Sequence, residues 1–458
     1  MRDTKRRFEM VSLFDHTHME KHLTNMAARG WLVEKIGHAG WVYRRIEPAD
    51  LTFAVTYFPD ASDFDPAPTE EQETFRDFCA HTGWEFAASS AQMQIFYNRR
   101  PDPVPIETDP DLQIDNIHRS MKKTMLIADP VLFLVLLMNL WNSWTRFRDD
   151  PVWFLSSSTQ LLCTGAFLIL LVLTAGELGA YFLWRRRAKR AAEQGLFRPT
   201  PNTSLLQRIC LTLAVLLLLG TVVLQTGNSG NQRLLLLAMG CTALMFAVIL
   251  GGKVLMKRLG VSRKTNLIVT ICLCLFVPLV FACAPYFVIY RAPEVLDRQE
   301  SPVSAEAAPL TVEMLLDMDP AELEVTFCYH DSSPLLSRTR FRQEQTYGLE
   351  QNWLYYSLAE IRVPALYDRC RQSMLEEMCD QSLYERFGEE TPYSAVAIAP
   401  EPWGADAVWQ LHYRDDSGLV TVSDTWLLCY PDRIVTLTLS WTPTPEQMAV
   451  IGTVFAGQ

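Results

Sequence analysis

Five runs of apolar residues separate the two more polar ends of this 458-residue chain. Most of them approach the roughly 20 residues that a helix needs to cross a hydrocarbon core about 30 Å thick. Because hydrocarbon offers no hydrogen-bond partner, each run must satisfy its own backbone groups, and a helix does so. The sequence therefore predicts about five transmembrane helices, at residues 124–141, 161–184, 209–224, 234–255 and 267–289.

Net charge changes along the chain in step with these runs. Residues 1–123 carry −5, residues 124–290 carry +10 and residues 291–458 carry −16. We therefore expect a multi-domain membrane protein built from five segments. They are an α+β domain at 1–100, a proline-rich linker and juxtamembrane segment at 101–123, the helical bundle at 124–290, a linker at 291–309 and a second α+β domain at 310–458.

Basic residues predict the orientation of the helices. The loop after the second run holds five Lys or Arg within residues 185–190, and the loop after the fourth holds five within residues 253–264. By the positive-inside rule both loops are cytoplasmic, which places the N-terminus inside and the C-terminus outside. The opening residues, MRDTKRRFEMVSLF, lack the apolar core of a secretory signal, so we expect none here.

A short pattern occurs twice near the N-terminus, as AARGW at 27–31 and AHTGW at 80–84, an offset of 53 residues. In each copy a helical spacing of apolar residues ends at a glycine, which favours the left-handed cap position. A tryptophan and alternating residues typical of strands follow. We predict two βαββ units that form one antiparallel sheet with both helices on one face, and interpret Trp31 and Trp84 as packing residues.

The residues around this pattern resemble a known family. The runs MEKHLTNMAARGWLVEKIGHAGWVYRRIEPADLTFAVTYFP and FRDFCAHTGWEFAASSAQMQIFYNRRP are similar to the bacterial domain of unknown function 2812, over about residues 5–120. His22 stands where that family's pattern leads us to expect tryptophan. The resemblance implies a soluble domain followed by transmembrane helices in a bacterial cell membrane, and genes often beside a PadR-type regulator. It implies no catalytic residue.

The last segment is predicted to be α+β and is strongly acidic. Residues 291–458 have 27 acidic residues against 11 arginines and no lysine, so this part of the chain would repel nucleic acid, and we expect no nucleic-acid partner. Helices are predicted at 310–318, 363–387 and 444–456. Strands are predicted at 322–330, 352–361, 408–414, 424–430 and 433–441, the last two joined at a Pro-Asp turn.

Asp129 and Glu177 are the acids inside the apolar runs. Counted from the basic residues at the run ends, both lie about 9–12 Å in from the cytoplasmic side. Ionisable residues within membrane spans are often functional, and two facing carboxyls could share a proton or receive a cation. The alternative is a structural pairing with basic loop residues such as Lys253.

Cysteines offer a second set of candidates. The outer segment has Cys328, Cys370, Cys379 and Cys429, an even number in a compartment that permits disulfides. Cys370 and Cys379 are nine residues apart on one predicted helix, so they face away from each other. If disulfides form, each would pair with Cys328 or Cys429. The cysteines of the apolar runs are interpreted as small core residues.

Motifs for chemistry are otherwise weak. His18 and His22 lie one helical turn apart near Asp15 and His16, a spacing that could hold zinc, but no further ligand pattern accompanies them. We find no phosphate-binding glycine loop and no nucleophile elbow. We therefore predict no catalytic residue, no metal and no cofactor.

Two classes of function remain as hypotheses. The first is a non-enzymatic sensor or regulator that links the outer domain to a cytoplasmic protein partner through the membrane helices. The alternative is a small transporter or permease component that uses Asp129 and Glu177. The odd number of predicted spans and the lack of a repeat among them disfavour transport. An enzyme acting outside the membrane is the third possibility.

Overall fold

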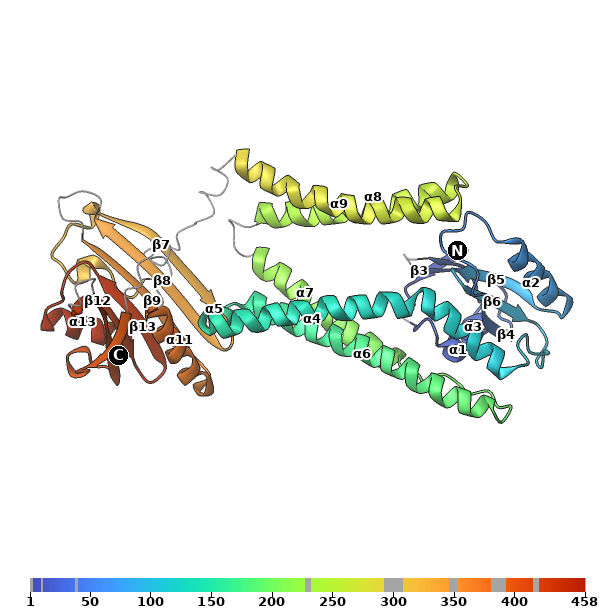
Figure 1. Ribbon diagram of the computed structural model, residues 1–458, viewed down its shortest axis with the longest axis horizontal. Helices are drawn as coiled ribbons and strands as arrows, with labels where there is room; N and C mark the ends of the chain where they lie inside the picture. The colour runs from blue at the N-terminus through green and yellow to red at the C-terminus, as the bar shows by residue number, and fades with distance from the viewer. Residues whose placement is uncertain are drawn as a thin grey trace. The chain divides into compact units, whose positions relative to one another are not determined.

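The computed structural model describes residues 3–9, 11–37, 40–226, 232–291, 308–345, 352–379, 393–414 and 420–457. The predicted linker at 291–309 lies almost entirely outside them. The chain forms two compact units, coloured along the chain in Figure 1. Unit 1 comprises Met1–Met138, Ala166–Leu216 and Leu234–Ala292, and unit 2 comprises Asn139–Gly165, Leu217–Arg233 and Pro293–Gln458.

Unit 1 begins with a domain in which the order strand, helix, strand, strand occurs twice. The first copy is β1 Thr4–Arg7, α1 His16–Ala28, β2 Trp31–Gly37 and β3 Gly40–Arg45. The second is β4 Thr52–Tyr57, α2 Glu70–His81, β5 Glu85–Ser90 and β6 Met93–Asn98. Gly30 and Gly83 follow the helix caps with φ of 81° and 90°, the left-handed conformation for which the sequence predicted glycine.

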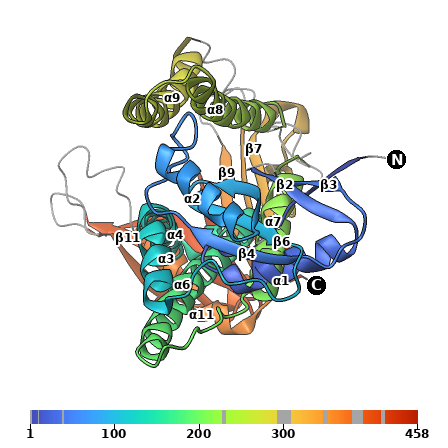
Figure 2. The ribbon, with the colours of Figure 1, turned by 90° about the vertical axis from the view of Figure 1, so that its right-hand side faces the viewer.

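The strands form two sheets, so the prediction of one continuous sheet is wrong. Their orders are β1-β3-β2 and β4-β6-β5, both antiparallel. β2 and β5 lie side by side without pairing. Figure 2 labels β2 and β3 of the first sheet and β4 and β6 of the second. Each carries a β-bulge, between Val33 and Lys35 and between Phe86 and Ala88, again 53 residues apart. A bulge bends and twists its strand, which disfavours a ladder between these two edges.

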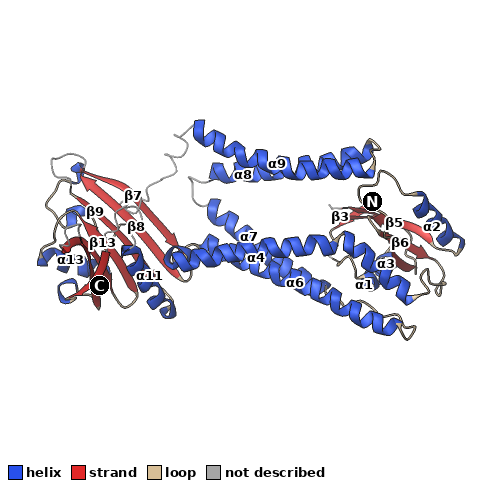
Figure 3. Cartoon of the chain, in the orientation of Figure 1, coloured by secondary structure: helices blue, strands red, loops and turns tan. Residues whose placement is uncertain are grey.

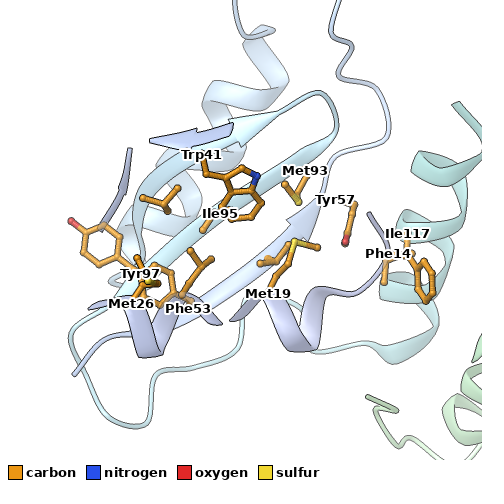
Figure 4. Close-up of a cluster of buried hydrophobic side chains, with 14 of the residues drawn as sticks. Phe14, Met19, Met26, Trp41, Phe53, Tyr57, Met93, Ile95, Tyr97 and Ile117 are labelled. Atoms are coloured by element: carbon orange, nitrogen blue, oxygen red, sulfur yellow. The ribbon is translucent and has the colours of Figure 1, made fainter. Parts of the chain in front are cut away.

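One hydrophobic core joins both sheets to α1 and to α3 (Pro110–Lys123), as Figure 4 shows. On α1 the residues Met19, Leu23 and Met26, at helical spacing, are at most 3% exposed. The segment predicted as a linker at 101–123 thus contains a helix, which packs through Ile117 and neighbouring apolar residues.

Five long helices follow, drawn in blue in Figure 3: α4 Met125–Asp149, α6 Ser158–Ala192, α7 Ser204–Thr226, α8 Gln232–Arg258 and α9 Arg263–Arg291. Among the described residues, four stretches are long and apolar enough to cross a membrane: Met125–Asp149, Ser158–Ala192, Ser204–Leu224 and Gly240–Arg258. The fifth predicted span, 267–289, falls in α9, whose side chains are described only as far as residue 278. That prediction therefore extends beyond the described residues.

Unit 2 contains one antiparallel sheet in the order β10-β11-β12-β13-β9-β8-β7. Its strands are β7 Leu323–Ser332, β8 Leu336–Gln345, β9 Trp353–Ile361, β10 Tyr393–Ile398, β11 Ala407–Arg414, β12 Val420–Cys429 and β13 Arg433–Leu439. The predicted hairpin is β12 and β13. Sequence reasoning missed β8, whose run of charged and polar residues hides its alternation, and β10. The helix predicted at 310–318 is only a 3-10 turn, Val312–Met314.

A hydrophobic core covers each face of this sheet. One core includes Ile451 and Phe455 of α13 (Pro445–Ala456). The other includes Met374 of α11 (Tyr367–Cys379) and Val152 of α5 (Pro151–Ser156). The short segment that joins α4 to α6 in the chain is therefore part of the core of the C-terminal domain.

Candidate functional site

Two connectors in the N-terminal domain hold the ends of the long helices of unit 1. The first connector, residues 8–15, joins β1 to α1, and the second connector, residues 58–69, joins β4 to α2. They occupy the same place in the two repeats. All contacts described for them below lie within unit 1.

The first connector packs against α6 mainly through Phe14. This ring is fully buried and lies 5.3 Å from the ring of Tyr181 and 5.9 Å from that of Trp184. Both α6 residues belong to the domain's own core, together with Ala188 and Ala192. The domain and this end of α6 therefore share one hydrophobic core, and they cannot separate without exposing it to water.

Hydrogen bonds add to this contact. The Asp15 carboxylate caps α1 and accepts hydrogen bonds from the His18 ring, at 2.7 Å, and from the hydroxyl of Thr200. Ser12 Oγ accepts a hydrogen bond of 2.5 Å from the side chain of Gln207 on α7. Asp15 is 1% exposed, so its burial depends on these donors.

The second connector is a compact loop held by its own polar groups. The backbone N–H of Ser62 donates to Asp65 Oδ2 at 2.7 Å, and the amide of buried Gln92 donates to the carbonyl of Ala61 at 2.9 Å. Aspartate and serine favour such turns because their side chains bond to nearby backbone groups. The turn presents Asp60, Asp63 and Asp65 within six residues of each other.

The acids of the second connector meet cations from α3 and α8. Asp60 Oδ1 lies 3.5 Å from Lys123 Nζ, and Lys123 also donates to the carbonyl of Pro59 at 2.5 Å. Asp63 Oδ2 lies 3.2 Å from Lys253 Nζ on α8. The same ammonium lies 5.0 Å from the centre of the Phe64 ring, and the face of an aromatic ring attracts a cation.

Helix α9 also holds the second connector. Arg263 donates to the carbonyl of Asp60 at 3.1 Å and lies 3.9 Å from Asp65 Oδ1. Asn266, which is fully buried, donates to the carbonyl of Phe64 at 3.2 Å. The second connector thus binds three helix ends by charge and hydrogen bonding, whereas the first binds α6 by apolar packing.

An acidic pocket of about 320 Å³ lies along β4, between α1 and the segment before α3. It is lined by Glu20, whose Oε1 accepts a hydrogen bond of 2.9 Å from the N–H of Val55, and by Glu107. Burial, with the nearby charge of Glu107, raises the pKa of Glu20 to about 7. Burial raises the pKa of Glu107 to about 7 as well. The two carboxyls therefore change charge near neutral pH.

The two predicted intramembrane acids both lie in unit 1, on two of the long helices. Asp129 on α4 and Glu177 on α6 lie close enough for their charges to interact, and Asp129 Oδ2 has no hydrogen-bond partner among the described residues. Lys253, the structural partner that the sequence suggested for them, is paired with Asp63 instead. A role for Asp129 and Glu177 in transport stays a prediction.

The four predicted disulfide cysteines are placed in unit 2 with free thiols. Cys328 belongs to the core on the α13 face of the sheet. Cys370 and Cys429 belong to the core on the α11 face, and Cys379 packs against that core. The sheet thus separates Cys328 from the other three, which leaves Cys429 as the better placed partner for Cys370 or Cys379. Disulfide formation stays a prediction.

The histidine cluster does not converge on one point. His18 pairs with Asp15, whereas His22 Nε2 lies 3.2 Å from Glu9 Oε1. Burial lowers the pKa of His16. In the described part of the chain, no group of three His, Cys, Asp or Glu side chains is arranged to hold a metal ion.

Comparison with known proteins gives a match for this domain. Residues 15–128 match the family described as Protein of unknown function (DUF2812). The resemblance inferred from the sequence is therefore confirmed. The match includes α1, the second connector and α3, and it ends within the first turn of α4. No curated protein and no solved structure matches the chain.

Sequence reasoning missed the second connector as a functional element. Its signal was present, because PDASDFD places three acids in a proline-bounded stretch of an acidic domain, and the following segment carries +10. Charge complementarity between the two blocks indicates contact but does not say which acid meets which base. The first connector left a weaker signal, since one buried phenylalanine in a short loop resembles any core residue.

Proposed function

We propose that the chain is a non-enzymatic membrane sensor or regulator. In this proposal the N-terminal domain lies in the cytoplasm of a bacterial cell and binds a protein partner, and the C-terminal domain lies outside the membrane. The observation that carries it is the attachment of the N-terminal domain to the helix ends by both connectors. A movement of α6, α8 or α9 would act directly on the surface of that domain.

The C-terminal domain supports the proposal because its core includes α5, the short helix between α4 and α6. Within unit 2, α5 joins α4 to α6 in the chain and contributes Val152 and Phe154 to the core. Its N-cap, Asp150, lies 2.9 Å from Arg338, which is 4% exposed and also pairs with Glu377 at 3.3 Å. A change in the outer domain would therefore act on α5 and through the chain on α6.

The test compares the proteins that co-purify with the full chain and with a chain lacking residues 310–458. We expect the amount of bound cytoplasmic partner to change when the outer domain is removed. Arg338→Met is a milder variant, because it leaves Asp150 and Glu377 without their cation. Arg342→Met on the same strand is the matched control, because Arg342 pairs with Glu344. Unchanged partners in the deletion, with an unchanged response to envelope stress, would contradict the proposal.

Orientation is tested separately with introduced thiols at two exposed positions, Glu47→Cys in the N-terminal domain and Glu446→Cys in the C-terminal domain. The proposal predicts that an impermeant thiol reagent added to intact cells labels Glu446→Cys above the parent chain and leaves Glu47→Cys unlabelled. The opposite labelling pattern would invert the topology.

A second candidate function is a transporter or permease component. The observation that favours it is the unpartnered Oδ2 of Asp129 close to Glu177. Flux of protons or small cations is measured in liposomes that contain the chain. The double variant Asp129→Asn, Glu177→Gln should then abolish the flux, and undiminished flux would exclude this role for the pair.

A further inference from the structure

A cavity of about 690 Å³ opens between the N-terminal domain and the last turns of α8, within unit 1. Its walls come from the ends of β2 and β5, from the second connector, from α2 and from α8. The proposed sensor function makes no use of this space.

Cations outnumber acids in the lining. The basic residues are Lys35, Arg76, Lys253, Lys257 and Arg258, and the acids are Asp63 and Asp65. Asp63 is paired with Lys253, and Asp65 is bonded by the N–H of Ser62 and lies near Arg263. Lys35, Lys257 and Arg258 have no acidic partner among the described residues. The cavity therefore has a positive potential that its own acids do not neutralise.

Arg76 is held in place before any anion arrives. Its guanidinium lies 3.9 Å from the centre of the Phe86 ring, and it donates to Gln94 at 3.2 Å and to Ser89 at 3.4 Å. Burial lowers the pKa of Arg76, and the charge of Glu73, one helical turn earlier, only partly offsets this effect. Among the described residues no carboxylate forms an ion pair with Arg76. A phosphate oxygen would supply the missing negative charge in a geometry that guanidinium favours.

The α8 wall is apolar on the side that continues into the candidate span Gly240–Arg258. Leu250 and Val254 line the cavity and are 48% and 51% exposed. Lys257 and Arg258 follow them at the end of the helix. Because the carboxyl end of a helix carries partial negative charge, these side chains and not the helix end must attract an anion.

We propose that this cavity binds the phosphate headgroup of an anionic phospholipid, with the acyl chains lying along Leu250 and Val254. Arg76 and the basic end of α8 hold the phosphate from two sides. Free inorganic phosphate could contact the same basic residues, but it has no acyl chain that would pack against the apolar wall. An amphipathic lining at the end of a membrane span therefore favours the lipid.

The test measures lipid retention by the purified full chain with native mass spectrometry. Delipidated protein is incubated with phosphatidylglycerol or with zwitterionic phosphatidylcholine. We expect selective retention of phosphatidylglycerol. The double variant Lys257→Gln, Arg258→Gln should weaken it on the order of thirtyfold, because two basic residues near an anionic surface together contribute about 2 kcal/mol. Arg76→Gln should weaken it as well.

The matched control is Arg186→Gln, Arg190→Gln, which removes the same charge from exposed positions on α6 that do not line the cavity. It should retain phosphatidylglycerol like the parent chain. Equal retention of both lipids, or equal loss in the control pair, would overturn the proposal. Calorimetry with inorganic phosphate is the third arm, and saturable binding as tight as that of the lipid would also overturn it.

Loss of folding should not account for weaker lipid retention by the double variant. Lys257 and Arg258 are exposed, so the double variant should keep the helical content that circular dichroism measures. The site goes beyond the proposed sensor function, and the two can fail separately. Lipid retention is measured on isolated protein, whereas the sensor proposal depends on partners in the cell.

Discussion

The two repeats of the N-terminal domain share their backbone plan and differ in how they hold the membrane helices. The strand order recurs in both repeats, and the left-handed glycine after the helix and the β-bulge recur at an offset of 53 residues. In both repeats the connector between the first strand and the helix contacts the long helices. The first connector uses a buried aromatic cluster, and the second uses aspartates against basic helix ends.

This comparison separates what the duplication kept from what each copy acquired. Backbone features are kept because a helix stop and a bulged strand are needed wherever the fold is repeated. Loop chemistry is free to differ, since loops vary in sequence more than the elements that they connect. The tryptophans show the same division. Trp84 is 3% exposed and donates to the carbonyl of Val104, whereas Trp31 is partly exposed beneath Lys5 and Arg45.

The largest effect is expected from Phe14→Ala in the first connector. The ring is fully buried between two aromatic rings of α6, so its loss should cost about 3–5 kcal/mol of unfolding free energy. Phe8→Ala is the control within the same connector, because Phe8 is 68% exposed. Thermal unfolding of the full chain in detergent measures both. Similar small losses in the two variants would show that Phe14 does not anchor α6.

Glu20 and Glu73 occupy equivalent positions on α1 and α2, and only Glu20 lines the acidic pocket. The pKa of Glu20 is raised from 4.5 to about 7, so the folded chain keeps a proton that the unfolded chain loses between those values. Stability therefore falls as pH rises through this window, and the penalty is complete above pH 7.

Glu20→Gln removes this penalty and keeps an acceptor for the N–H of Val55. We expect it to raise the unfolding free energy by on the order of 1–3 kcal/mol at pH 8 and to give no gain near pH 4.5. Glu73→Gln should give no such pH-dependent gain, because Glu73 is exposed. Melting temperatures across pH 4.5–8 test this, and a pH-independent effect of Glu20→Gln would refute the assignment.

The two cap glycines should differ in their sensitivity to a side chain. A Cβ at Gly30 would lie 2.9 Å from the carbonyl oxygen of Ile46, whereas at Gly83 it would lie 3.4 Å from the side chain of Asn98. Both substitutions place alanine at positive φ, which costs about 1–2 kcal/mol. Gly30→Ala should therefore lower the melting temperature more than Gly83→Ala. A larger decrease in melting temperature for Gly83→Ala than for Gly30→Ala would contradict this expectation.

The smallest effect is expected from the second connector. Lys253→Gln should cost less than about 1 kcal/mol, because the Lys253–Asp63 pair is partly exposed. A charge swap, Lys253→Asp with Asp63→Lys, should recover part of the loss that either reversal causes. Melting temperatures of the parent chain, the two single reversals and the charge swap, measured at low and high salt, give the coupling energy between the two residues. This coupling energy should vanish at high salt. A coupling energy that is the same at low and high salt would contradict an electrostatic contact.

The sequence predicted the parts that depend on local patterns. The apolar runs, the glycine stops and the hairpin between Cys429 and Arg433 follow from periodicity and turn chemistry. The single sheet was predicted wrongly, because no local signal tells whether β2 and β5 pair or only lie side by side. α5 was missed since its six residues are too few for a periodic pattern, and only the distant strands of unit 2 explain its burial.

The candidate site could be predicted less well from the sequence, because it depends on contacts between residues that are far apart in the chain. Asp63 and Lys253 are 190 residues apart, and their pairing depends on the fold that brings α8 beside the second connector. The shared depth of Asp129 and Glu177 was predicted from the regular rise of a helix, and a joint role of the two carboxyls stays a prediction. Depth along a helix can be read from a sequence, but the partners of a loop cannot.

Hydrogen exchange in the two connectors of the full chain tests the central comparison most directly. Raising salt from about 0.1 M to 1 M shortens the Debye length from about 10 Å to 3 Å and weakens exposed ion pairs. Amide exchange at residues 59–65 should accelerate, while exchange at residues 12–16 should stay unchanged because apolar packing is not screened. Equal responses of the two connectors would contradict the account of one fold holding its helices by two kinds of chemistry.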